Sequence, residues 1–236
     1  MIELCREGRC RKYNVNKDAL LREDSMSFYL LGAFFADGHF NDRKHNLCIA
    51  ISSKDDDWLS NIRNVICPNK PIYCRAGHYS FEFSDVDCMN WLISWGCTPR
   101  KSKTATIEKE IPERFRRDFF RGVVDGDGCL THSKYRKKKK DREYEYMKRT
   151  IYVCSASEPF IYQLSNIVPS EIHYSICKLK NNKSHINGRD VIPKSNIFRI
   201  IFNDKNAISV AKWAYYENHN ISLNRKRVKA EGWMQE

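Results

Sequence analysis

Apolar residues follow two patterns along this chain, and the two patterns alternate in a regular order. The run "LLGAFFADGHF" (Leu30 to Phe40) has the character of a buried helix and stops on Asp37 and Gly38. The segments "HYSFEF" and "IFRIIF" alternate apolar and polar residues, as strands with one covered face do. Each of these strands runs into a segment with helical spacing, which starts at Asp85 in the first case and at Asp204 in the second.

The same order of elements occurs twice. The segment "LLGAFFADG" aligns with "FRGVVDGDG", which matches Gly32 with Gly122 and Asp37 with Asp127. In each half the order is helix, two strands, helix, two strands, helix, and each half closes on a basic tail. The pattern therefore predicts an α+β fold built by duplication of one αββαββα unit.

Changes in composition place the boundaries of these units. We expect a basic N-terminal extension over residues 1–26, which is either an arm or a short helix packed on the first half. The first domain then covers residues 27–97, a polar linker with two prolines covers 98–114, and the second domain covers 115–236. The second half has the longer hairpins, and one insertion, "SKYRKKKKDREYEYMKR", is strongly basic.

The net charge narrows the class of partner. A formal charge of +12 on 236 residues favours a polyanion such as nucleic acid. No apolar stretch approaches the roughly 20 residues needed to cross a bilayer, and the first residues lack the apolar core of a secretory signal. Ten cysteines without a C-x-x-C pair indicate reduced packing thiols. We therefore expect an intracellular protein with no membrane partner.

The two matching helices carry small residues and acids at corresponding positions. Gly32 and Ala36 are four residues apart, as are Gly122 and Gly126, so each pair lies on one helical face. If the helices pack through these faces, their ends bring Asp37 and Asp127 together. Two carboxylates that also face their own helix dipoles repel one another, and bound divalent cations would resolve the repulsion.

At these residues the sequence resembles the LAGLIDADG homing endonucleases, and the resemblance covers about residues 27 to 227. It implies a monomer of two pseudo-symmetric domains packed through the two signature helices, each with a curved antiparallel sheet in the major groove of double-stranded DNA. Asp37 and Asp127 would each bind Mg²⁺ with the carbonyls of Ala36 and Gly126, and would make staggered cuts, one in each strand. Phe35 departs from the pattern, because the second copy has Asp125 there.

Other residues are candidates for supporting roles. Ser53, Lys54 and Ser155 fall at strand ends where the family keeps polar residues that order water, although Lys54 is equally well explained as a surface lysine. Lys101 and Lys226 stand at corresponding basic tails, where contact with DNA phosphates is the favoured role.

Base reading is expected from strands, since no helix-turn-helix or zinc-finger pattern occurs. The basic run "RKKKK" favours nonspecific attraction to phosphates over base reading. The candidate DNA-binding residues are Arg43, His45, Tyr73, Arg75 and His78 in the first half, and Lys134, Tyr144, Tyr146, Lys148, Lys178, Lys180, Asn182 and Arg199 in the second.

Two alternatives use the same scaffold. One is a maturase that binds intron RNA and assists splicing, with or without DNA cleavage. The other is a catalytically silent DNA-binding regulator, which would be expected to lose an acid. Both acids are present, which favours a site-specific, Mg²⁺-dependent endonuclease over the regulator and leaves a bifunctional maturase open.

Overall fold

The computed structural model describes residues 13–43, 46–139, 142–179, 184–186, 189–191 and 196–235. In chain order its elements are α1 (Asp18–Leu21), α2 (Ser25–Asp37), β1 (Gly38–Arg43), β2 (Asn46–Ser53), α3 (Asp56–Ile66), β3 (Tyr73–Arg75), β4 (His78–Phe83), α4 (Val86–Ser94), the 3₁₀ turns η1 (Lys101–Lys103) and η2 (Glu113–Phe115), α5 (Arg116–Asp127), β5 (Gly128–Lys139), β6 (Arg142–Ser155), α6 (Glu158–Ile167), β7 (Ser175–Leu179), β8 (Ser184–Ile186), β9 (Arg189–Val191), β10 (Ile197–Asn203), α7 (Lys205–Ala214) and α8 (Asn224–Met234).

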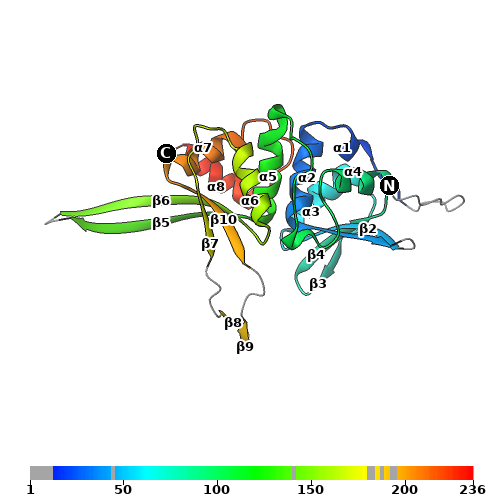
Figure 1. Ribbon diagram of the computed structural model, residues 1–236, viewed down its shortest axis with the longest axis horizontal. Helices are drawn as coiled ribbons and strands as arrows, with labels where there is room; N and C mark the ends of the chain where they lie inside the picture. Colours follow the sequence, from blue (N-terminus) through cyan, green and yellow to red (C-terminus); the bar gives the residue numbers. More distant parts are fainter. Residues whose placement is uncertain are drawn as a thin grey trace, which may run out of the picture.

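Each half builds one antiparallel four-stranded sheet, with strand orders β1-β2-β4-β3 and β5-β6-β10-β7. Helices cover one face of each sheet, and the two sheets lie side by side with their other faces turned the same way (Figure 1). The short β8-β9 pair is inserted between β7 and β10. The predicted α+β duplication is confirmed, and the uncovered side of each sheet is called the outer face below.

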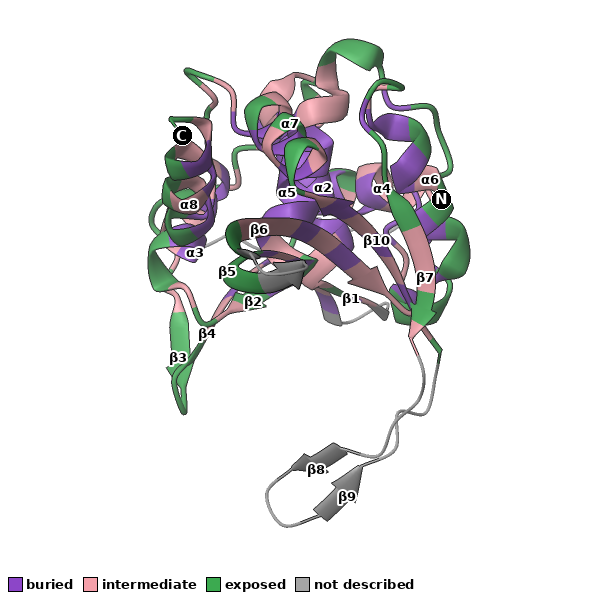
Figure 2. Ribbon diagram, turned by 90° about the vertical axis from the view of Figure 1, so that its left-hand side faces the viewer, coloured by how far each residue is buried: buried purple, intermediate pink, exposed green. Residues whose placement is uncertain are grey.

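Helices α2 and α5 form the centre of the molecule, and their apolar residues are buried on nearly all sides (Figure 2). A Cβ placed on Gly32 would lie 2.1 Å from the carbonyl oxygen of Phe119, and one on Gly122 would lie 2.1 Å from that of Tyr29. Neither position has room for a side chain, so the two helix backbones touch at this crossing. The small-residue faces pack on each other as the sequence predicts.

The other helices start where the sequence marks them. Asp55 and Ser157 precede α3 and α6, while Asp85 and Asp204 precede α4 and α7. Asp85 accepts hydrogen bonds from the backbone N–H groups of Asp87 and Cys88, as an N-cap does. Within the described ranges, no helix combines the length and the apolar character needed to cross a membrane.

Residues 13–24 pack against the first half. Leu20 in α1 is fully buried, the amide of Asn16 donates to the carbonyl of Ile66 (2.8 Å), and Lys17 forms ion pairs with Asp85 and Asp87. Of the two possibilities for the N-terminal extension, this part is a short packed helix, and residues 1–12 lie outside the described ranges.

The segment 98–114 is irregular apart from η1 and the start of η2, as expected for a connection. Gln163 of α6 accepts a hydrogen bond from the amide of Ile107 and donates one to its carbonyl. The hydroxyl of Ser157 donates to the carbonyl of Ala105 (2.6 Å). These bonds hold the connection along the second half, so it is a packed segment.

Candidate active site and nucleic-acid interface

Asp37 and Asp127 end helices α2 and α5 and lie beside each other's helix. The Asp37 Oδ2 atom lies 3.0 Å from the position that a Cβ on Gly126 would occupy. Conversely, Asp127 and Ala36 line the same pocket of about 240 Å³. The absence of a side chain on Gly126 is therefore what lets the Asp37 carboxylate approach the second half. The convergence expected from the spacing of small residues is present.

The pair is electrostatically unfavourable by itself. Burial, and then the charge of Asp127, raise the pKa of Asp37 to about 7, and the nearby Lys226 and Lys101 offset part of this rise. Burial likewise raises the pKa of Asp127, although one side of this residue faces solvent. The acids thus favour neutralisation by a proton or by a bound cation.

Two buried lysines hold the ends of the helices that carry these acids. The Lys226 ammonium donates to the carbonyls of Val124 (2.8 Å), Asp125 (2.6 Å) and Gly126 (3.2 Å), which are the last carbonyls of α5 before Asp127. Positive charge at this point opposes the negative end of the helix dipole. Burial lowers the pKa of Lys226 to about 8, and the charges of Asp125 and Asp37 offset part of the shift.

Lys101 performs a related task in the first half. Its ammonium donates to the carbonyl of Gly38 (2.6 Å), next to Asp37, and burial lowers its pKa. Lys101 is 6% exposed and Lys226 is 4% exposed. Contacts from an exposed basic tail to phosphates, the role expected from the sequence, do not fit this burial. The structure places both lysines inside the site instead.

The oxygen atoms of the site suit a hard divalent cation. In the described part of the chain, no cluster of three or more His, Cys, Asp or Glu side chains exists that could enclose a metal ion. Mg²⁺ is commonly held by one or two carboxylates together with waters and substrate phosphates, and it does not need such a cluster. The carboxylates of Asp37 and Asp127 therefore fit Mg²⁺ and fit Zn²⁺ poorly. The carbonyl of Gly126, which the sequence also predicts as a metal ligand, accepts a hydrogen bond from the Lys226 ammonium (3.2 Å).

A pH dependence of stability follows from the raised pKa of Asp37. Its pKa in the folded state lies above the unfolded value of about 4, so its contribution to stability is full below about pH 4 and is lost as pH rises through about 7. In the presence of a chelator, we expect the melting temperature to fall between about pH 5 and about pH 8, and to fall less in Asp37→Asn. Equal pH dependence of the melting temperature in both proteins would contradict a raised pKa of Asp37 in the folded state.

The predicted serines occupy equivalent places in the two halves. The Ser53 hydroxyl accepts a hydrogen bond from the amide of Asp55 (3.1 Å), and Ser155 does the same for Ser157 (3.1 Å). Ser155 also lines the pocket with Asp127. Lys54 is exposed to solvent, which matches its interpretation as a surface lysine.

Sequence reasoning missed an ion pair that links the halves near the site. Arg225, in the first turn of α8, makes two hydrogen bonds to the Asp55 carboxylate (2.8 and 3.0 Å), which lowers the pKa of Asp55. The two residues are far apart in the sequence, and no pattern in the sequence connects them.

In the first half, strand alternation places three candidate DNA-binding residues on the outer face. Phe81 and Phe83 of β4 are buried beneath the helices, so His78 points the other way. Tyr73 pairs with Ser80 and Arg75 pairs with His78, which puts both on the same face as His78. Of the remaining candidates here, the Arg43 side chain and all of His45 lie outside the described residues.

In the second half the candidates divide between the two faces. Buried Leu130 and Val153 define the helix side of β5 and β6. Lys134 is an even number of residues from Leu130 on β5, and Lys178 is paired with buried Phe198, so both lysines lie on the helix side of the sheet. They therefore cannot contact a ligand that lies along the outer face. The candidates on the outer face are Tyr144, Tyr146, Lys148 and Arg199. Lys180 and Asn182 lie outside the described residues.

The outer face also carries aromatic residues that sequence reasoning missed. Tyr135 is exposed and stacks on Tyr146, with ring centroids 5.7 Å apart, and the Lys148 ammonium lies 5.9 Å from the Tyr135 ring. Near the body of the sheet, the Arg199 guanidinium lies 4.2 Å from the Tyr152 ring. The alternation of side chains along β5 and β6 would have identified Tyr135, given the register.

Several solved structures share this architecture. At 11% identity the chain superposes on the LAGLIDADG homing endonuclease I-LtrWI bound to target DNA, with a TM-score of 0.54 over 93% of this chain and 90% of that one. Meganuclease I-SmaMI bound to uncleaveable DNA (TM-score 0.52, 11% identity) and LAGLIDADG meganuclease I-AabMI bound to uncleaved DNA (TM-score 0.54, 11% identity) each match over 88% of both chains. No protein-family profile and no curated protein sequence matches the chain.

The fold is therefore the two-domain fold of LAGLIDADG homing endonucleases, with two four-stranded sheets flanking a central helix pair. The resemblance indicated by the two signature segments is confirmed at the level of the fold.

Proposed function

We propose that this protein is a metal-dependent DNA endonuclease that cuts both strands of a long, asymmetric duplex target. The observation that carries the proposal is the position of Asp37 and Asp127. Two acids from the two halves share one site at the ends of the central helices, between two sheets whose outer faces turn the same way. The DNA-bound endonucleases with the same fold support the class of substrate.

In this proposal each acid, with nearby main-chain carbonyls, holds Mg²⁺. Bound divalent ions supply Lewis acidity toward a phosphate oxygen and toward water. The protein's own residues fix the geometry: Lys101 and Lys226 hold the helix ends, and their charges keep the two carboxylates close. Ser155 lies in the same pocket as Asp127, where its hydroxyl orders water beside the scissile phosphate.

The DNA lies along the two outer faces. In the first half this face carries Tyr73, Arg75 and His78, and in the second the paired strands β5 and β6 extend it well beyond the body of the molecule (Figure 1). The net charge of +12 matches a polyanionic ligand. Because the two halves present faces of different length and composition, the target is asymmetric.

Footprinting on a duplex selected from a randomised library tests DNA binding by both halves. A half of about 100 residues is roughly 34 Å across, so two halves cover about 68 Å, which is about 20 base pairs at about 3.4 Å each. If there are about 6 to 10 phosphate contacts, affinity should fall about 10³- to 10⁵-fold between about 50 and 200 mM salt. Protection of fewer than about 10 base pairs, or a flat salt response, would contradict the proposal.

Two lysines of the β5–β6 hairpin allow the proposed DNA-binding surface to be tested with a matched control. Lys148 lies on the outer face beside Tyr135, and Lys134 lies on the opposite face. We expect Lys148→Ala to weaken binding and to reduce the slope of log affinity against log salt by about 1, because one phosphate contact is lost. Lys134→Ala should leave the slope unchanged in the same titration. The reverse result would mean that the hairpin presents its other face to DNA.

A further inference from the structure

Asp125 is a buried acid that the proposed chemistry does not use. It is 1% exposed, and its carboxylate accepts three hydrogen bonds: from the hydroxyls of Tyr29 (2.8 Å) and Tyr215 (2.6 Å), and from the backbone amide of Leu223 (2.8 Å). These donors come from α2, from the end of α7 and from the residue before α8. A buried carboxylate with three donors from three elements joins those elements into one unit.

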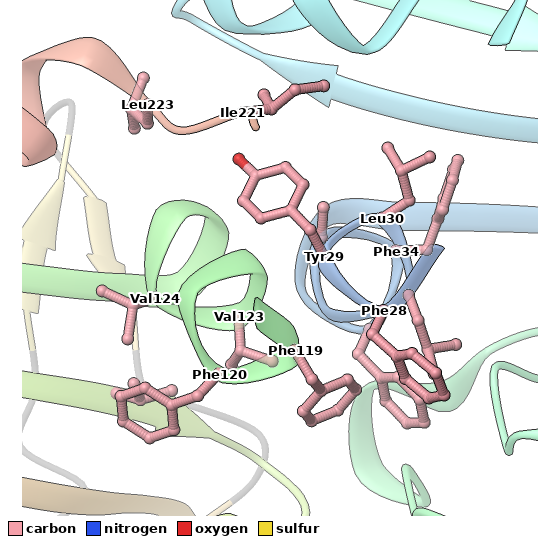
Figure 3. Close-up of a cluster of buried hydrophobic side chains, with 14 of the residues drawn as sticks. Phe28, Tyr29, Leu30, Phe34, Phe119, Phe120, Val123, Val124, Ile221 and Leu223 are labelled. Carbon is pink, nitrogen blue, oxygen red and sulfur yellow. The ribbon is translucent and has the colours of Figure 1, made fainter. Parts of the chain in front are cut away.

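The bond to Leu223 fixes the start of α8. The carbonyl of Leu223 accepts hydrogen bonds from the amides of Lys226 and Arg227 (3.0 Å each), so Leu223 defines the first turn of the helix. Figure 3 shows Tyr29 of α2 with its hydroxyl turned toward the segment that carries Ile221 and Leu223. The hydrogen bond from Leu223 to Asp125 therefore anchors the first turn of α8.

The main chain of Asp125 also contacts the first turn of α8. Its carbonyl oxygen accepts a hydrogen bond from the Lys226 ammonium (2.6 Å), and the carbonyls of Val124 and Gly126 accept the other two. An ammonium has three donors, so the three carbonyls satisfy it completely. Lys226 reaches this position only if the turn that carries it is held in place.

The first half lacks this arrangement. Phe35 stands where the second half has Asp125, and its ring stacks on Phe160 (5.2 Å) and meets Phe119 edge-on (5.5 Å). The corresponding lysine, Lys101, belongs to the short turn η1 and donates to the carbonyl of Gly38. A change at Asp125 should therefore act on Lys226 and leave Lys101 undisturbed.

We propose that Asp125 is the positioning residue of the second-half lysine: it anchors the Leu223 amide and thereby places Lys226 on the carbonyls at the end of α5. The consequence for activity, which rests on the proposed endonuclease function, is that the two DNA strands are cut at different rates. Loss of this anchor should slow one of the two cuts and spare the other, so that nicked duplex accumulates.

Competitive acylation of lysines, read by mass spectrometry on the metal-free protein without DNA, tests the positioning directly. In Asp125→Asn the charged carboxylate becomes a neutral amide, whose oxygen is a weaker acceptor for the Leu223 amide and whose NH₂ group cannot accept at all. We expect the acylation rate of Lys226 to rise about 10-fold, as for loss of one buried hydrogen bond, with that of Lys101 unchanged. Unchanged labelling of Lys226, or an equal rise at both lysines, would overturn the proposal.

Asp118→Asn is the matched control. Asp118 is also 1% exposed and lies on α5, but its carboxylate is bonded to Arg121 and to Tyr216 and does not contact the start of α8. We expect this variant to lose stability without selective labelling of Lys226. If Asp125→Asn does not fold, Tyr215→Phe removes only one of the three bonds and should give a smaller but still selective rise.

Strand-resolved cleavage on a labelled duplex is the second readout. Asp125→Asn should cut one strand about 10- to 100-fold more slowly than the other, as for loss of a residue that orients an active-site group. Equal slowing of both strands would contradict the half-specific role. Selective labelling of Lys226 in a protein that cuts no DNA at all would refute the endonuclease function and leave the positioning role intact.

Discussion

Replacement of either Asp37 or Asp127 by Asn is expected to abolish double-strand cleavage, with a loss of at least about 10³-fold in the single-turnover rate. Each acid offers a charged oxygen to a divalent ion, and Asn offers only a neutral one. The affinity for duplex should stay near that of the unaltered protein, because neither acid lies on the outer face of a sheet. Gel-based cleavage with Mg²⁺, together with binding in Ca²⁺, measures both quantities.

The control for this pair is Asp87→Asn, which changes an exposed acid in the first turn of α4 that is paired with Lys17. It should cut DNA at the unaltered rate. Cleavage at the unaltered rate by Asp37→Asn or by Asp127→Asn would show that these carboxylates do not hold the metal.

Replacement of Gly122 by Leu is expected to destabilise the whole fold by about 3 kcal/mol or more. A Cβ there would lie 2.1 Å from the carbonyl oxygen of Tyr29 and 2.8 Å from the amide nitrogen of Ala33, and these backbone atoms cannot move without separating the two helices. The melting temperature should fall by roughly 6 to 12 °C. DNA cleavage should be lost at the same time, since the separation also displaces Asp37 and Asp127.

Gly232→Leu in α8 provides the comparison, because a Cβ at Gly232 meets no atom within 4 Å. It should change the melting temperature little. An unchanged melting temperature in Gly122→Leu would mean that α2 and α5 do not cross at this glycine.

The sequence predicted those features that depend on local spacing or on repetition. Gly32 and Gly122 mark the helix crossing because their positions recur in both halves, and the ends of α2 and α5 at Asp37 and Asp127 follow from the same repeat. Asp55 and Ser157 mark helix starts through their position before a helical pattern. Each of these inferences needs only local spacing or the comparison of one half of the sequence with the other.

Features that depend on tertiary packing could not be predicted from the sequence. Lys226 follows a basic, polar stretch and looks exposed, but the fold of α8 onto α5 buries it against three carbonyls. Lys134 and Lys178 lie on the opposite face of the sheet from Lys148, and a one-residue change of strand register would exchange these faces. The position of Asp125 relative to Phe35 was visible as a departure from the repeat, although its three partners were not.

The most direct measurement of the central claim is cleavage of a randomised duplex library with Mg²⁺, followed by sequencing of the ends. Paired, staggered breaks within one long asymmetric site are expected from the unaltered protein, and none with a chelator or from the double variant Asp37→Asn, Asp127→Asn. Intact DNA under all conditions, or the same breaks from the double variant, would contradict the account of Asp37 and Asp127 as the acids of a metal-dependent endonuclease.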